Sequence, residues 1–217
     1  MREVTKRYYI QETELCILLA LKGVRTLYGI CLDSDAAMTQ EELYYNLFTM
    51  QKKGILSEKF QIEEELDCCV GRICTAARFQ VLADADELVP EKYFYVASEG
   101  AVMLEPVGQY DTGEQKGSFY LEAITEDEMW DRIRDNGFQT KTADVPVPDQ
   151  ILEAARHYWK EDKNAILQHA IVGKLLQEYD IQTQCKTKQC IRFLCGLDTY
   201  LVCSDGSDVI EGGGERS

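Results

Sequence analysis

The sequence is poor in the residues that most often carry catalysis or bind metals. Among its 217 residues there are only two histidines, His157 and His169. Neither belongs to an H-E-x-x-H pattern or to another familiar metal-ligand spacing. Each lies in a predicted helix without a partner motif, which is typical of an ordinary polar residue. We therefore expect no metal site. Since no nucleophile–base pattern is visible either, the sequence predicts a protein that is not an enzyme.

Long apolar runs and phosphate-binding loops are missing as well. No segment approaches the roughly 18 uninterrupted apolar residues of a membrane-spanning helix. Residues 1–8 lack the apolar stretch of a secretory signal. Neither G-x-G-x-x-G nor G-x-x-x-x-G-K-S/T occurs, so no cofactor is expected. These absences predict a cytoplasmic protein without a membrane partner.

Positive charge is scarce too. The 23 Lys and Arg residues are outnumbered by 38 Asp and Glu residues, which gives a formal charge of −15. An acidic surface repels phosphate backbones, and no run of Lys and Arg interrupts it, so nucleic acid is not an expected partner. The acidic clusters at residues 63–65 and 126–128 lie at predicted helix N-termini. The helix dipole favours acids there, so we do not interpret them as catalytic or metal-binding groups.

Cysteine is the abundant exception, with nine residues. Cys185, Cys190 and Cys195 are separated by four residues each, at the edge of the C-x2–4-C spacing of zinc hooks. Cys190 and Cys195 have opposite parity on a predicted strand, so their thiols should face opposite sides of a sheet. We interpret them, with Cys203 and the helical Cys69, as small core residues whose thiols stay reduced.

Apolar periodicity predicts an α+β fold with antiparallel sheets. Thr39 and Glu42 form a capping box that opens a helix with an apolar stripe of Leu43, Leu47, Phe48 and Met50, ending at Lys52-Lys53-Gly54. The other helices are predicted over residues 11–22, 62–77, 125–137, 149–159 and about 164–179. Strands are predicted over residues 25–31, 79–83, 93–97, 102–107, 118–124, 189–195 and 199–204, and after Gly206.

Two stretches of the chain are alike. Residues 95–105 (YVASEGAVMLE) align without a gap with residues 201–211 (LVCSDGSDVIE), and each describes a hairpin with a Ser-acid-Gly turn. Upstream, a V-G-R/K-I/L motif lies on a predicted helix in both copies, at Val70 and at Val172. A repeated helix-plus-hairpin unit predicts two related halves around a pseudo-two-fold axis. The alternative is coincidence, because Ser, Asp, Glu and Gly are common in hairpins.

The predicted halves are joined by a proline-containing stretch. The N-terminal α+β half comprises residues 1–139, and an extended connector with Pro146 and Pro148 spans residues 140–148. Residues 149–211 form the C-terminal half of the same domain. The glycine-rich residues 212–217 have little to bury and are expected to be a disordered tail.

Two segments resemble a known family. Residues 41–56 (EELYYNLFTMQKKGIL), followed by a short polar gap and a helix, resemble the L-x-x-L-x-x-K/R-G-L-L region of EspG-like proteins, the cytosolic chaperones of type VII (ESX) secretion. Residues 191–206 (IRFLCGLDTYLVCSDG) are similar to the family's closing segment. The chain is shorter than typical members, and its cysteines and strong acidity are not family hallmarks. These motifs are patterns of size and polarity without an invariant chemical residue.

The resemblance implies two related α+β halves and a non-enzymatic adaptor that keeps helical export substrates soluble and export-competent. A protein partner is therefore expected, and the sequence determines neither its identity nor the oligomeric state. The polar loop over residues 109–117 is the candidate contact, because such exposed insertions often carry binding residues. The alternative is a long hairpin connection without such a role. The candidate binding residues are Gln109, Tyr110, Asp111, Gln115 and Lys116.

A winged-helix regulator is the competing interpretation. Residues 39–55 resemble the helix ending in "kkGil" that precedes the wing in many bacterial regulators, and residues 12–23 suit the first helix. A DNA-reading helix needs outward Arg, Lys, Asn or Gln side chains. This helix instead offers a poor, acidic set of side chains: Glu41, Glu42, Tyr44, Tyr45 and Asn46. The winged-helix interpretation therefore stays open for protein binding and is disfavoured for DNA binding.

Overall fold

The computed structural model describes residues 6–30, 32, 38–84, 89–107, 117–138, 146–159, 171–206 and 208–216. Within these ranges the chain forms five helices and nine strands, which confirms the α+β class. The strand pairs β1–β5, β4–β5, β2–β6, β6–β7, β7–β8 and β8–β9 are all antiparallel. None of the described helices is long and apolar enough to cross a membrane.

The chain forms two compact units. The first unit comprises Met1–Ala77 and Phe94–Glu126, and the second comprises Arg78–Tyr93 and Asp127–Ser217. These units differ from the predicted halves, because residues 78–93 and 127–139 join the C-terminal part of the chain. The reason is strand pairing: Arg78 lies opposite Asp180 and Leu82 opposite Leu176 in an antiparallel register.

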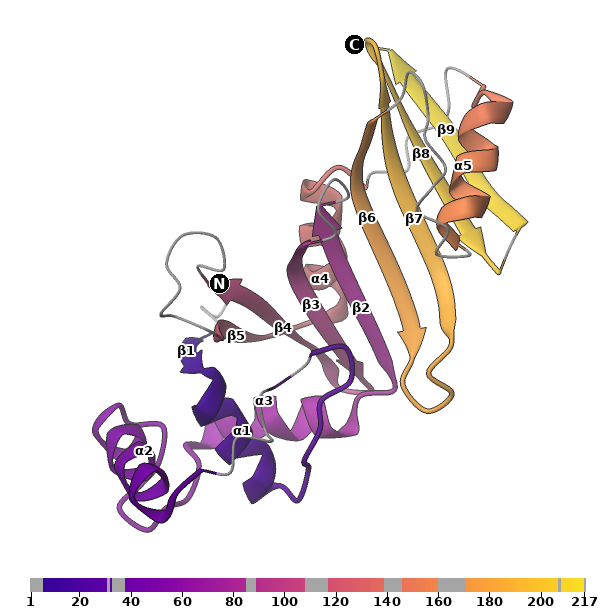
Figure 1. Cartoon of the computed structure of the whole chain (residues 1–217). Coiled ribbons are helices and arrows are strands. Elements are labelled where there is room, and N and C mark those ends of the chain that lie inside the picture. The colour runs from indigo at the N-terminus through magenta and orange to yellow at the C-terminus, as the bar shows by residue number, and fades with distance from the viewer. Residues whose placement is uncertain are drawn as a thin grey trace. The chain divides into compact units, whose positions relative to one another are not determined.

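The first unit combines three helices with four neighbouring strands (Figure 1). Its strand order is β1-β5-β4-β3, and β3 continues into the second unit. Helix α3 packs Leu66, Cys69, Val70 and Ile73 inward against β4 and β5. The elements are β1 (Arg7–Gln11), α1 (Glu12–Leu21), α2 (Gln40–Lys52), α3 (Glu64–Thr75), β3 (Val89–Ala97), β4 (Gly100–Val107) and β5 (Ser118–Ile124).

Two local differences from the sequence predictions concern short strands in the first unit. Strand β1 was not predicted, although Tyr8 and Ile10 alternate with exposed residues along it. Its partner is β5, with Tyr8 opposite Leu121, so the pairing depends on a segment far along the chain. The strand predicted over residues 25–31 is wrong, since only Leu27 and Ile30 form an isolated bridge there.

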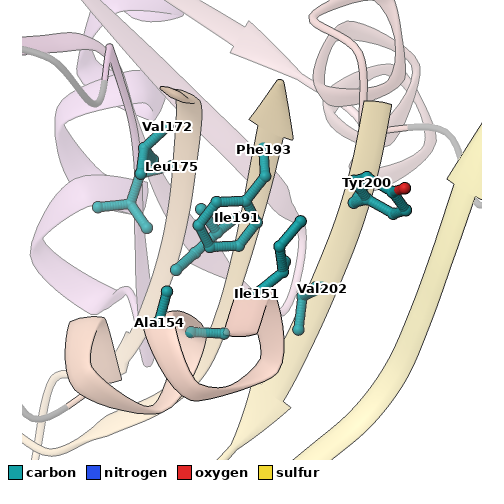
Figure 2. Close-up of a cluster of buried hydrophobic side chains, with 9 residues drawn as sticks. Ile151, Ala154, Val172, Leu175, Ile191, Phe193, Tyr200 and Val202 are labelled. Carbon is teal, nitrogen blue, oxygen red and sulfur yellow. The ribbon is translucent and has the colours of Figure 1, made fainter. Parts of the chain in front are cut away.

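The second unit is an antiparallel sheet with helix α5 packed on one face. Its strands follow the order β3-β2-β6-β7-β8-β9. Figure 2 shows Ile151 and Ala154 of α5 against Ile191 and Phe193 of β7, and Val202 of β8 belongs to the same buried cluster. The elements are β2 (Arg78–Asp84), α4 (Glu126–Asp135), α5 (Asp149–Trp159), β6 (Ile171–Asp180), β7 (Lys186–Cys195), β8 (Asp198–Asp205) and β9 (Asp208–Arg216).

The helix predicted over residues 164–179 is wrong from residue 171 onward, where the chain forms β6. A register shift between Val172 and Lys174 interrupts the β6–β7 ladder. This bulge turns Val172 toward the same buried cluster as Leu175, so apolar residues three apart share one face of a strand. Val172, Leu175 and Leu176 therefore have the i, i+3, i+4 spacing that is typical of a helix, although Leu176 lies on the opposite face of the strand.

The two copies of the internal repeat have the same structure only in their hairpins. The first copy lies on β3 and β4, and the second lies on β8 and β9. The upstream motif is helical in α3 at Val70 but extended in β6 at Val172. A helix-plus-hairpin unit is therefore not duplicated, and the pseudo-two-fold relation is not confirmed.

The glycine-rich end of the chain is also more ordered than predicted. Strand β9 runs to Arg216 and pairs with β8, with Val202 opposite Gly212 and Asp198 opposite Arg216. The sequence argument considered only side-chain burial, whereas ladder hydrogen bonds need none. Residues 140–145 of the predicted connector lie outside the described ranges, and residues 146–148 precede α5 without regular structure.

The cysteines are partly as predicted. Cys190 and Cys203 are buried, but they form a disulfide between opposed positions of β7 and β8, with Cα atoms 4.1 Å apart. The expectation of reduced thiols is therefore wrong for this pair. Cys195 packs toward the α5 cluster, so it faces the opposite side from Cys190, as parity predicted. Burial raises the pKa of the Cys69 thiol to about 11, which makes it unreactive at neutral pH.

Candidate functional site

The loop predicted to contact a partner lies outside the described residues. Gln109, Tyr110, Asp111, Gln115 and Lys116 all belong to residues 108–116. Their role stays a prediction, and the candidate site is built from described residues.

Helix α2 begins and ends where the sequence predicted. The backbone N–H of Glu42 donates to Thr39 Oγ1 over 3.2 Å, and the backbone N–H of Thr39 donates to Glu42 Oε2 over 2.8 Å. That second bond is the main cause of a lowered pKa at Glu42. The helix ends near Gly54, whose φ of +74° suits a residue without a Cβ atom. These two caps define the first and last residues of α2.

An ion pair joins the C-terminal end of α2 to α1. Lys53 Nζ lies 2.7 Å from Glu14 Oε1, and only 1% of the Glu14 side chain is exposed. Glu14 is itself held by the backbone N–H of Gln11, which donates to its Oε2 over 2.9 Å. Met50 is completely buried. Together these contacts attach one side of α2 to the first unit.

The opposite side of α2 presents aromatic rings to solvent. Tyr44, Tyr45 and Phe48 are 62%, 72% and 56% exposed, and Phe48 lies beside both tyrosines because it is four residues after Tyr44 and three after Tyr45. We call these three residues the α2 aromatic face. Lys52 extends it, with Nζ 4.5 Å above the Phe48 ring. Three adjacent exposed rings are more than the scattered apolar residues of an ordinary surface.

The sequence only partly indicated this surface. Its predicted stripe is correct for Met50 and wrong for Phe48 and Leu43, which are exposed, while Leu47 is half-buried. Tyr44 and Tyr45 lie outside the predicted stripe, and both are exposed. The signal was an excess of apolar residues: α2 carries six large apolar or aromatic side chains, more than one inward-facing stripe of a 13-residue helix can bury.

The other sequence candidates have structural roles or lie outside the described residues. Glu63 caps α3, because its carboxylate accepts a 3.0 Å hydrogen bond from the backbone N–H of Leu66. The Tyr8 hydroxyl donates to the same carboxylate over 2.6 Å, which is the main cause of a lowered pKa at Glu63. His157 is exposed on α5, and His169 is not described. Among the described residues, no group of three or more His, Cys, Asp or Glu side chains is placed to hold a metal ion.

No protein-family model and no curated protein that was compared with this chain matches it. The α2 aromatic face offers no nucleophile or base. What it can supply is apolar contact area with a charged residue at either end, Glu41 and Lys52. This composition is typical of the centre of a protein–protein interface, where tyrosine and phenylalanine are enriched.

Proposed function

We propose that this protein is a non-enzymatic adaptor that binds another protein through the α2 aromatic face. The observation that carries the proposal is the exposure of Tyr44, Tyr45 and Phe48, each more than half accessible to solvent. Rigid aromatic side chains give large contact areas for little lost entropy, so they are frequent interface anchors. The ion pair between Lys53 and Glu14 supports this role, because it holds the helix before a partner arrives.

The partner proposed is a small helical protein that contributes the apolar stripe of an amphipathic helix. Rings spaced i and i+4 on α2 match the spacing of side chains on a second helix packed beside it. Glu41 and Lys52 at the two ends favour a partner helix with charges in the reverse order. The net charge of −15 further disfavours a strongly acidic partner.

The likeness to EspG-like chaperones gives this proposal a specific form. Residues 41–56 carry part of that likeness, and all of α2 except its first residue, Gln40, lies within them. In this form, the protein keeps helical type VII secretion substrates soluble in the cytoplasm until export. Genes for WXG-motif proteins or an FtsK-type ATPase beside the gene for this chain would be the corresponding genomic observation. A winged-helix regulator is the alternative, and binding of DNA in the experiment below would favour it.

Co-purification from the native organism tests the proposal. Tagged full-length protein is compared with a Tyr45→Ser/Phe48→Ser variant and with Leu197→Ser, which removes a 77% exposed apolar residue from the second unit. We expect wild type and Leu197→Ser to retain the same small helical protein in fixed stoichiometry, and the double variant to lose it. With the purified partner, the double variant should weaken binding by at least about 30-fold, or 2 kcal/mol.

Three outcomes would contradict the proposal. Recovery of DNA in place of protein would favour the winged-helix alternative. A partner retained equally by all three proteins would place its binding site elsewhere. Wild type that sediments as a homodimer, while the double variant sediments as a monomer, would show that a second copy covers the α2 aromatic face.

A further inference from the structure

The second unit contains a cavity of about 150 Å³ beneath helix α4. It lies on the face of the sheet opposite to α5, because Cys190 and Leu201 line it while their strand neighbours Ile191 and Val202 pack against α5. Its apolar walls come from Trp130 and Ile133 of α4, from Phe138, and from Leu176 and Leu201 of the sheet. The Cys190–Cys203 disulfide completes this lining.

One residue of the cavity wall, Gln80, has a side-chain oxygen without a hydrogen-bond partner. Gln80 on β2 is only 1% exposed, and within the described part of the chain its Oε1 atom accepts no hydrogen bond. A buried acceptor left unsatisfied costs about 1–3 kcal/mol, so native proteins rarely retain one without a reason. Gln80 therefore brings an unsatisfied buried acceptor to the lining of an apolar cavity.

The orientation of the Gln80 amide follows from its neighbour. Gln80 Nε2 donates to Glu178 Oε2 over 2.6 Å. Glu178 lies 3.5 Å from Arg78 Nη1 and accepts a 3.1 Å hydrogen bond from Thr187 Oγ1, so both contacts use its oxygens as acceptors. A reversed amide would place two oxygen acceptors against each other. Oε1 consequently faces away from Glu178.

The charged residues of the cavity wall have oppositely charged neighbours. Arg134 pairs with Asp131 on α4, Glu178 pairs with Arg78, and Lys188 lies opposite Glu178 in the β6–β7 register. The rest of the lining is apolar apart from Gln80. Because an ion loses its hydration in such a lining, a neutral ligand is favoured.

We propose that the cavity binds a small neutral aromatic molecule whose single O–H or N–H group donates to Gln80 Oε1. The volume supports this size, because an apolar cavity of roughly 150 Å³ holds a benzene-sized ring. Trp130 and Phe138 supply aromatic walls against which such a ring packs. The donor supplies the hydrogen bond that Gln80 lacks. The site belongs to the second unit alone and does not depend on the proposed adaptor function.

Phenol and toluene test the hydrogen bond, since they differ mainly in replacing a hydroxyl by a methyl group. Their dissociation constants are measured by NMR titration of the full-length wild type and of Gln80→Met, which keeps side-chain length and removes the carbonyl. Glu178 keeps Arg78 and Thr187 as partners in that variant. We expect the phenol-to-toluene affinity ratio to fall about tenfold in Gln80→Met. Comparing ratios cancels the different transfer energies of the two ligands.

A second pair of variants tests the location without altering Gln80. Leu201→Phe adds volume to the cavity wall, whereas Leu197→Phe makes the same change at a 77% exposed position in the β7–β8 turn. Leu201→Phe should abolish binding of both ligands, and Leu197→Phe should bind them as wild type does. The proposal is overturned if wild type shows no saturable binding, if Leu201→Phe binds phenol normally, or if the affinity ratio is unchanged in Gln80→Met.

Discussion

Glu63 connects three parts of the first unit through one carboxylate. It accepts hydrogen bonds from Tyr8, from the backbone N–H of Leu66 and from Lys6, whose Nζ lies 3.1 Å from Oε1. The same contacts explain both pKa shifts: the bond from Tyr8 lowers the pKa of Glu63, and burial together with the neighbouring Glu63 raises the pKa of Tyr8. A residue that the sequence marked only as an acid near a helix dipole thus joins β1 to α3.

Replacing Glu63 by alanine should lower the free energy of unfolding at pH 7 by about 1 kcal/mol, the usual effect of removing a helix cap. Because its folded pKa is lowered, this stabilisation is present above the ordinary glutamate value of 4.5 and is lost as the pH falls through the folded value. The difference between variant and wild type should therefore shrink below about pH 4.5. Urea unfolding followed by circular dichroism at several pH values measures it.

Glu64→Ala is the matched control for this prediction. It removes the same charge from the same helical turn, but Glu64 is exposed and does not cap the helix. Its effect should stay within about 0.5 kcal/mol. Equal destabilisation by both substitutions at pH 7 would mean that the helix dipole, and not the Glu63 cap, is responsible.

At the scale of elements, the β7–β8 hairpin contains a disulfide where reduced thiols were expected. The disulfide closes a loop with a sequence separation of 13 residues and connects two strands that are already hydrogen-bonded. Closing a loop of this length restricts the unfolded chain and stabilises a protein by about 3 kcal/mol. The hairpin also forms part of the cavity wall, so its stability bears on the proposed ligand site.

Reduction should destabilise the second unit accordingly. Both tryptophans, Trp130 and Trp159, belong to that unit, so their fluorescence reports its unfolding in urea. Dithiothreitol should lower the free energy of unfolding of wild type by about 3 kcal/mol and leave Cys190→Ala/Cys203→Ala unchanged. Cys195→Ala, which keeps the disulfide, should respond as wild type does. A wild type insensitive to dithiothreitol would restore the prediction that these thiols are reduced.

Elements were predictable where their signal is local. The Thr39–Glu42 capping box marks the beginning of α2 within four residues, and the turn at Ser98-Glu99 marks the β3–β4 hairpin equally well. Strand β6 was missed because the bulge beside Gly173 gives it helix-like spacing. Strand β1 was missed because its partner β5 lies more than 100 residues away. Local chemistry encodes caps and turns, whereas register and pairing depend on distant residues.

The candidate sites follow the same rule. Exposure of Tyr44, Tyr45 and Phe48 could be suspected from an excess of apolar residues on one helix. The free Gln80 carbonyl could not, because its amide orientation depends on Glu178, 98 residues further along the chain. The cavity walls likewise combine α4 with four strands. A tertiary hydrogen bond, and not a sequence motif, identifies that site.

At the scale of the whole molecule, the two proposed sites belong to different units. The α2 aromatic face lies in the first unit and the cavity in the second. Neither site shares a residue with the other. Each proposal can therefore fail without the other failing, provided that the variants are exchanged between the two assays.

Exchanging the variants gives the last prediction. Tyr45→Ser/Phe48→Ser should bind phenol with the affinity of wild type, and Leu201→Phe should bind the helical partner with the affinity of wild type. Saturating phenol should change partner affinity less than twofold, because a ligand couples to a distant site only when it favours one of two conformations. Calorimetric titration of the partner, with and without phenol, measures this coupling. A larger change would require the partner to alter phenol affinity by the same factor, and that reciprocal result would show that the two units communicate.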